Sequence, residues 1–180
     1  MKKISYLLFL LCCFFVNGQS ASNTNNAQTL QSKMSVKVLS AYQQNTSTKV
    51  EDLFSYFQML TDVSLTNDVK KEIITNINLL FNNQNPMVID FTSDTNEFIL
   101  LQKLIQKLLI SEPISFKVSD EIKYNSLTDK SWNDSYIVER TKSRVTKNMN
   151  INQTIFMVME DKKFGENSKT IWNVFLGSIR

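Results

Sequence analysis

Histidine is absent from the 180 residues of this sequence. Imidazole is the commonest protein ligand of zinc and the general base of Ser–His and Cys–His pairs. Its absence therefore excludes imidazole metal sites, both nucleophile pairs and histidine-based pH switches. Cysteine occurs only at Cys12 and Cys13. The chain has 3 glycines and 2 prolines, which excludes collagen, glycine-rich linkers and proline-rich recognition tails.

Sequence motifs of the common site types are also missing. The chain has no glycine-rich dinucleotide fingerprint, no P-loop, no GxSxG nucleophile elbow and no EF-hand loop. We therefore predict no cofactor, no metal site and no recognisable set of catalytic residues. What is present is an ordinary globular composition, with 42% hydrophobic and 21% charged residues.

The charge balance argues against a nucleic-acid partner. The formal net charge of +3 comes from 20 basic and 17 acidic residues, and two of the lysines, Lys2 and Lys3, lie at the start of the chain. Without these two the net charge would be +1. A domain so close to neutrality lacks the positive field expected of a nucleic-acid binder.

The first 18 residues have the pattern of a signal peptide. Two lysines precede an apolar run over 4–16, and a cleavage site is expected after Gly18. Cleavage there would remove Cys12 and Cys13, leaving no disulfide or thiol. We predict a secreted or periplasmic protein with no integral membrane segment after cleavage. A retained anchor and a lipoprotein are the alternatives, although no small residue precedes either cysteine as a lipid-attachment site requires.

Residues 19–32 are polar and predict a flexible spacer, so residues 33–180 would form a single domain. Residues 34–42 fit either a short strand or the first turns of a helix. Beyond them, three helices are predicted from apolar residues at helical spacing. The first begins at a capping box of Thr48 and Glu51, and the second begins at 66–68. The third carries a stripe of Phe98, Leu101, Ile105 and Leu108.

Strands are predicted on both sides of the third helix and beyond it. Residues 87–92 and 114–122 are short candidates, and 124–134 is interpreted as a loop. Three longer extended segments follow, at 135–147, 152–163 and 169–179. The middle one carries consecutive apolar residues, which is typical of a strand covered on both faces.

The last two segments predict an antiparallel hairpin turning about Glu166. In that pairing Val158 meets Val174 and Phe156 meets Leu176, so apolar side chains match across the strands. With helices first and strands gathered at the end, the order predicts an α+β fold, a curved antiparallel sheet wrapped against three N-terminal helices.

From Met34 onward this order of elements resembles the nuclear transport factor 2-like superfamily, which has a cone-shaped, cystatin-like fold. The closing strand, residues 171–179 (IWNVFLGSI), is similar to the last strand of many secreted members. The resemblance implies an apolar pocket at the wide end of the cone. It also implies an isomerase or dehydratase, a binding module, or a homodimer. The Asp–His pair of some family enzymes is impossible here, whereas an Asp–Tyr arrangement remains open.

Asp90 is the first candidate site residue. It lies between Ile89 and Phe91, and desolvation by apolar neighbours could raise the pKa of its carboxyl so that it acts as a general base. The alternative is that its strand is an edge and that Asp90 points outward.

A second candidate is a basic stripe. Arg140, Lys142 and Arg144 would share one face of a strand and bind an anion, or else form a solvated outer face. If a hairpin turns near Asn150, Arg140 would face Glu160, with Trp172 beside it. Tyr136 and Trp132 flank the predicted polar loop and would rim a ligand mouth, or else anchor the start of a strand. The predicted ligand-binding residues are Arg140, Glu160, Trp172, Tyr136 and Asp90.

Two functions follow from these observations. The first is an exported, non-catalytic binding or interaction module that uses an apolar pocket or a sheet face. Its partner would be a small apolar or anionic ligand, or another protein. The alternative is a small isomerase or lyase with Asp90 or Glu160 as general base and Tyr136 or another tyrosine as hydrogen-bond donor to a developing oxyanion.

Overall fold

The structure is a computed structural model that describes residues 35–119, 122–125, 128 and 130–180. The predicted signal peptide and the predicted spacer lie outside the described residues. Export and cleavage after Gly18 therefore remain predictions.

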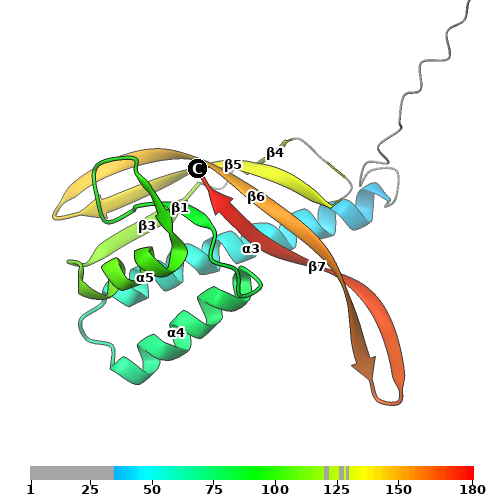
Figure 1. Cartoon of the computed structure of the whole chain (residues 1–180). Helices are drawn as coiled ribbons and strands as arrows, with labels where there is room; N and C mark the ends of the chain where they lie inside the picture. The colour runs from blue at the N-terminus through cyan, green and yellow to red at the C-terminus, as the bar shows by residue number, and fades with distance from the viewer. Residues whose placement is uncertain (1–34, 120–121, 126–127, 129) are drawn as a thin grey trace, which may run out of the picture.

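Three helices form one part of the fold (Figure 1), α3 (Val36–Thr61), α4 (Asn67–Leu80) and α5 (Leu101–Ile110). The hydroxyl of Ser35 caps α3 by accepting the backbone N–H of Val38, and Thr66 caps α4 in the same way. The predicted start of α4 at 66–68 is thus confirmed. Residues 34–42, left open between strand and helix, are helical from Val36 on.

The predicted capping box at Thr48 and Glu51 is wrong, because α3 is already helical there. Thr48 lies in its interior, and its hydroxyl donates to the carbonyl oxygen of Gln44 at 3.4 Å. A threonine in mid-helix can form this bond to the preceding turn, so the same spacing does not always mark a helix start.

Strands form two antiparallel sheets. β1 and β2 make a small ribbon, and the other five strands make the main sheet in the order β3-β5-β6-β7, with β4 also paired to β5. Phe98, predicted in the stripe of the third helix, lies in β2 instead, and α5 begins at Leu101. The strand bounds are β1 (Met87–Ile89), β2 (Phe98–Leu100), β3 (Ile114–Val118), β4 (Lys123–Asn125), β5 (Ser131–Lys142), β6 (Val145–Phe164) and β7 (Asn167–Ile179).

The main sheet curls around α3. This helix contacts both β3 and β7, which are the two ends of the strand order, and only a strongly bent sheet brings both ends to one helix. Figure 1 shows β5 and β6 arching over α3. The predicted fold class, α+β with a curved antiparallel sheet against three helices, is therefore confirmed in the form of a half-barrel.

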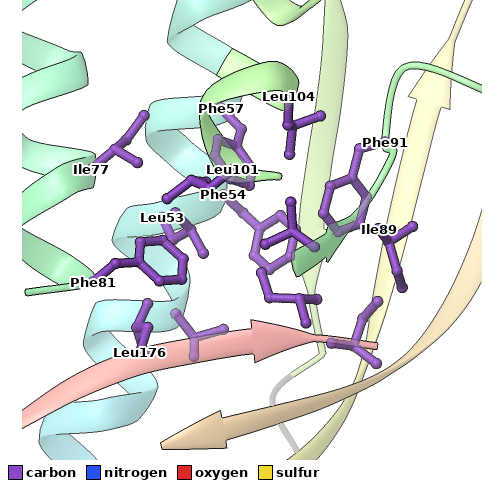
Figure 2. Close-up of a cluster of buried hydrophobic side chains, with 14 of the residues drawn as sticks. Leu53, Phe54, Phe57, Ile77, Phe81, Ile89, Phe91, Leu101, Leu104 and Leu176 are labelled. Carbon is purple, nitrogen blue, oxygen red and sulfur yellow. The ribbon is translucent and has the colours of Figure 1, made fainter. Parts of the chain in front are cut away.

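An apolar core fills the space between the helices and the inner face of the sheet. Figure 2 shows side chains from α3, α4, β1, α5 and β7 converging there. Phe54 meets Phe57 and Phe91 edge to face, with ring centroids 5.9 and 5.3 Å apart. Each such ring contributes about 1.5–3 kcal/mol by leaving water, so this core dominates the stability of the domain.

The turn between β5 and β6 is at Ser143 and Arg144, and the predicted turn near Asn150 is wrong. Both residues have positive φ, 50° and 67°, as a tight two-residue hairpin turn requires. The predicted strand 135–147 is consequently two strands, and Arg140 is paired with Lys147.

The hairpin of β6 and β7 is confirmed, but its predicted register is wrong by one residue. Met157, rather than Val158, is the partner of Val174, because the hairpin turns through both Gly165 and Glu166, with Phe164 paired to Asn167, and not about Glu166 alone. A bulge between Gln153 and Ile155 lies farther from the turn and shifts the pairing by one residue there. The prediction that 155–159 is covered on both faces is also wrong, since Met159 is 57% exposed.

Gly177 of β7 lies under the ring of Phe156. A Cβ at this position would stand 2.4 Å from Phe156 Cε2, so the strand requires glycine here. The hairpin itself continues past the helices, as Figure 1 shows. Among the described helices, none is both long and apolar enough to cross a membrane.

Candidate functional site

Arg140 is buried and holds the loop that joins β1 to β2. Its Nη1 donates to the carbonyl oxygens of Phe91 at 3.1 Å and Ser93 at 2.6 Å, and its Nη2 bonds the carboxylate of Asp94. This guanidinium therefore serves the fold, because it satisfies carbonyl groups that the loop would otherwise leave without partners.

Of the other members of the predicted basic stripe, Lys142 shares the face of Arg140 in β5, whereas Arg144 does not. Lys142 donates to the carbonyl oxygen of Thr92 at 2.9 Å, and Lys147 from β6 donates to that of Asp94 at 3.1 Å. Arg144 lies in the turn, so it does not continue the face of β5. The predicted three-residue stripe is thus wrong, and its two strand members bind a loop of the same chain.

Asp90 follows β1 and is completely buried, so the alternative that it points outward is wrong. Lys107 of α5 donates to Oδ2 at 2.5 Å, and Thr92 donates to Oδ1 from both its backbone N–H and its hydroxyl. Burial alone would raise the pKa of Asp90, but the bonds from Lys107 and Thr92 outweigh it and hold the pKa below its usual value. A carboxylate so stabilised is a poor general base at neutral pH.

Glu160 and Trp172 lie on opposite faces of the β6–β7 hairpin. Trp172 is the partner of Met159, whereas Glu160 is the partner of Ile171 and accepts from Asn173 Nδ2 at 3.2 Å. Neither is the strand partner of Arg140, so the predicted pairing of Arg140 with Glu160, with Trp172 on the same side, is wrong.

Tyr136 is the predicted residue that lies at a distinctive polar cluster. Trp132, Asp134 and Tyr136 alternate along β5 on its inward face, and Gln153 of β6 is the strand partner of Asp134. All four are buried, three of them completely. The hydroxyl of Tyr136 donates to Gln153 Oε1 at 2.6 Å, and its ring meets that of Phe54 at 6.2 Å. We call Trp132, Asp134, Tyr136 and Gln153 the inner polar cluster.

Most polar atoms of the inner polar cluster lack a partner among the described residues. The unpartnered atoms are Trp132 Nε1, both carboxylate oxygens of Asp134, and Gln153 Nε2. They are four of the five buried side-chain polar atoms without a hydrogen bond in the described structure, the fifth being Arg140 Nε. Each such atom costs about 1–3 kcal/mol, so four at one place need an explanation.

Burial sets the acid–base behaviour of the inner polar cluster. It raises the pKa of Asp134 to about 7, although the neighbouring indole N–H of Trp132 acts in the opposite direction. Burial, together with the negative charge of Asp134, raises the pKa of Tyr136 well above its usual value. At neutral pH the carboxyl is therefore divided between its two protonation states, while the phenol is neutral.

Sequence reasoning missed Asp134 because residues 124–134 were interpreted as a loop. The outward residues there, Asn133 and Ser135, are polar, and Asp134 itself breaks the apolar half of the pattern. The usable signal was the alternation of large side chains at Trp132, Tyr136 and Val138, which continues through Asp134 at a period of two.

The inner polar cluster offers two acceptor oxygens and two N–H donors within an otherwise apolar face. Together they can hold a small polar group, and Asp134 can also accept a proton. The part of the chain that the structure describes contains no group of three or more aspartate, glutamate, cysteine or histidine residues that could hold a metal ion.

Comparison with protein-family models, with curated proteins and with solved structures finds no match to this chain. The argument for function therefore depends on the chemistry of the site.

Proposed function

We propose that this domain is an exported binding module that holds the polar group of a small ligand at the inner polar cluster. The observation that carries the proposal is the concentration of four unpartnered polar atoms on Trp132, Asp134 and Gln153. A folded chain keeps few such atoms, because each one weakens it. Bonds to a ligand would satisfy them and repay that cost.

The fold supports a place in the nuclear transport factor 2-like superfamily, which we also propose. The helices precede the long strands, and the sheet bends around α3 as the cone of that family does. The inner polar cluster lies on the inner face of this bend. Members of that family bind ligands within the cone, which agrees with a ligand at Asp134.

Nuclear magnetic resonance can test the proposed binding site directly. The chain has only two tryptophans, so a ¹H–¹⁵N spectrum should show two indole N–H signals. A library of small polar molecules should contain members that move the signal of Trp132 and leave that of Trp172 in place. Trp132→Phe assigns the two signals. If no member moves the Trp132 signal, or both signals move together, the proposal is wrong.

A small isomerase or lyase is the second candidate, and the raised pKa of Asp134 favours it. A carboxylate with a pKa of about 7 is well matched to removing a proton from carbon beside a carbonyl group. The free N–H groups of Trp132 and Gln153 could then stabilise the oxyanion. Tyr136 is not the donor in this scheme, because its hydroxyl already donates to Gln153.

Deuterium exchange separates catalysis from binding alone. Ligands found by the titration are incubated with the protein in D₂O, and the loss of a carbon-bound proton signal is followed with time. Catalysis predicts exchange that Asp134→Asn abolishes. Exchange at the rate of the protein-free solution would leave only the binding function.

Export and self-association belong to the same proposal. The mass of the mature protein should correspond to a chain beginning at Gln19, without lipid. An unprocessed chain, or one carrying a lipid, would contradict export as a free domain.

A homodimer is proposed from the family resemblance, and sedimentation of the mature protein at several concentrations tests it.

A further inference from the structure

We propose that the ligand of the inner polar cluster is a small organic cation, an amine with a hydroxyl or carbonyl oxygen close to its nitrogen. This inference rests on the binding function proposed above and names its ligand class. The ammonium group would pair with the carboxylate of Asp134, and the oxygen would accept from Trp132 Nε1 and Gln153 Nε2.

The charge of the missing partner follows from the surroundings of Asp134. The described residues provide no lysine or arginine within ion-pair distance of its carboxylate, although the side chain is completely buried. The titratable neighbour on the same strand face is Tyr136, whose hydroxyl is already bonded to Gln153. Buried carboxylates in proteins are normally paired or hydrogen-bonded, so a cation from outside the fold is the natural complement.

Asp90 shows what a satisfied buried carboxylate looks like in this domain. It is equally buried, and it receives an ammonium group from Lys107 together with two further bonds from Thr92. The inner polar cluster lacks such an ammonium group. A ligand amine in the position that Lys107 has at Asp90 would give Asp134 the same type of contact.

Aromatic neighbours strengthen the case for a cation. Trp132 and Tyr136 stand two residues before and two residues after Asp134, on the same face of β5. Successive residues on one face of a strand are about 7 Å apart, so one aromatic side chain lies on each side of the carboxylate. Aromatic side chains beside a carboxylate are a common arrangement for binding organic ammonium groups.

The two free N–H groups define the rest of the ligand. Trp132 Nε1 and Gln153 Nε2 are donors, and a simple alkylammonium ion has no acceptor for them. An oxygen one or two carbons from the nitrogen would satisfy them. Amino alcohols and amino carbonyl compounds carry both kinds of group, and the apolar side chains around the cluster favour a short hydrocarbon chain.

Four probes with the same six-carbon chain test this assignment. They are hexylamine, hexanol, hexanoate and 2-amino-1-hexanol, each titrated into the wild-type protein at pH 7 and constant ionic strength. The Trp132 indole signal reports binding, and the Trp172 signal is the internal control. We expect 2-amino-1-hexanol to bind most tightly, and hexylamine to bind about tenfold more tightly than hexanol or hexanoate.

Two variants test the role of the carboxylate. Asp134→Asn should lower the affinity for hexylamine about tenfold, to the level of hexanol. Asp52→Asn is the matched control, because Asp52 is an exposed carboxylate on α3, and it should change nothing. Equal losses in both variants, or none in Asp134→Asn, would overturn the assignment of the ammonium group to Asp134.

The outcomes separate the ligand class from the binding function. If hexanol or hexanoate moves the Trp132 signal at the same concentration as hexylamine, the cation is wrong and the binding site stands. If none of the four probes moves that signal, the ligand class is wrong. If the polar library also fails, the proposed function is wrong with it. The comparison of hexylamine with hexanol uses the wild-type protein alone, so it does not depend on the folding of any variant.

Discussion

Two buried aspartates in this domain have opposite surroundings. Asp90 accepts bonds from Lys107 and Thr92, and its pKa lies below the usual value despite burial. Asp134 is as deeply buried, but neither of its oxygens accepts a hydrogen bond of normal geometry from the described residues. The nearby indole N–H of Trp132 offsets the effect of burial only in part, and the pKa is about 7. Burial alone does not decide the state of a carboxyl, because the donors that surround it matter as much.

The difference arises from where each residue lies. Asp90 directly follows a short strand, so the loop after it can fold back and offer Thr92, while α5 presents Lys107. Asp134 lies within β5, where its backbone pairs with neighbouring strands and its side chain lies on the face that carries the apolar core. We interpret the first arrangement as structural and the second as a site prepared for a partner.

The largest expected effect concerns the pH dependence of stability. Because the pKa of Asp134 is about 7 in the folded state and about 3.9 when unfolded, the folded chain binds more protons between these values. The free energy of unfolding should therefore fall by about 4 kcal/mol from this group as pH rises from about 4 to above 7. Urea unfolding between pH 4.5 and 8 should show about 3 kcal/mol of this change.

Asp134→Asn removes the titrating group and should flatten this part of the pH profile. The lowered pKa of Asp90 acts in the opposite direction, since its contribution is lost as pH falls below about 4. The chosen range avoids that region. If the free energy of unfolding changed with pH equally in the wild type and in Asp134→Asn, Asp134 would have to be hydrogen-bonded in the folded protein. Its surroundings would then not differ from those of Asp90.

Arg140→Ala should give the next largest effect, a loss of about 3 kcal/mol in the free energy of unfolding. It leaves the carbonyl groups of Phe91 and Ser93 without their donor and frees the loop that carries Thr92. The pH profile between 4.5 and 8 should keep its slope, because Asp134 is untouched. Lys162→Ala, at an exposed position of the β6–β7 hairpin, is the control and should stay within about 0.5 kcal/mol. If Arg140→Ala lowered the free energy of unfolding by no more than this control does, a structural role of Arg140 would be contradicted.

The same substitution in the two aspartates should act with opposite sign. Asp90→Asn removes charge-assisted bonds to Lys107 and Thr92, and we expect it to cost about 2 kcal/mol at pH 7.5. Asp134→Asn should instead stabilise the protein at that pH, because it removes an unpaired buried charge. Thermal unfolding of both variants in one buffer is sufficient. Shifts in the same direction would refute our distinction between the two sites.

The smallest predicted effect comes from Arg144→Gly. Arg144 has a φ of 67°, which glycine adopts without strain, so the change should stabilise the protein by about 0.5–1 kcal/mol. It touches neither aspartate. The gain should therefore be equal at pH 5 and pH 8, and a gain that depends on pH would mean that the turn is coupled to Asp134.

Local signals predicted those parts of the fold that depend on neighbouring residues. The cap at Thr66 and the hairpin with its turn near Gly165 depend on the chemistry of a few adjacent residues, and both are confirmed. The order of helices and strands likewise indicated the α+β class. In contrast, the predicted centre of that turn at Glu166 was wrong, because Gly165 and Glu166 both lie in the turn, so the predicted register was wrong by one residue.

The candidate site was less predictable, because its chemistry depends on contacts between distant residues. The acceptors of Arg140 lie at 91–94, and the partner of Asp90 is Lys107 on helix α5. Of the five predicted ligand-binding residues, Tyr136 alone lies in the inner polar cluster. Asp134 was missed because acidic residues are rare at inward positions of a strand, so the segment that contains it was interpreted as a loop.

The β6–β7 hairpin extends beyond the helices (Figure 1). Its exposed residues are separated from Gln153, and so from the inner polar cluster, by several residues of β6. At its tip, a Cβ added at Gly165 would meet no other atom within 4 Å, and Glu166 is exposed. A fluorophore or a tether joined there would leave the strand positions of the core untouched. Side chains alternate between the two faces of a strand. Adding or deleting two residues in each strand would therefore lengthen or shorten this hairpin and preserve the orientation of every remaining side chain. The domain thus carries a ready attachment point for immobilised measurements.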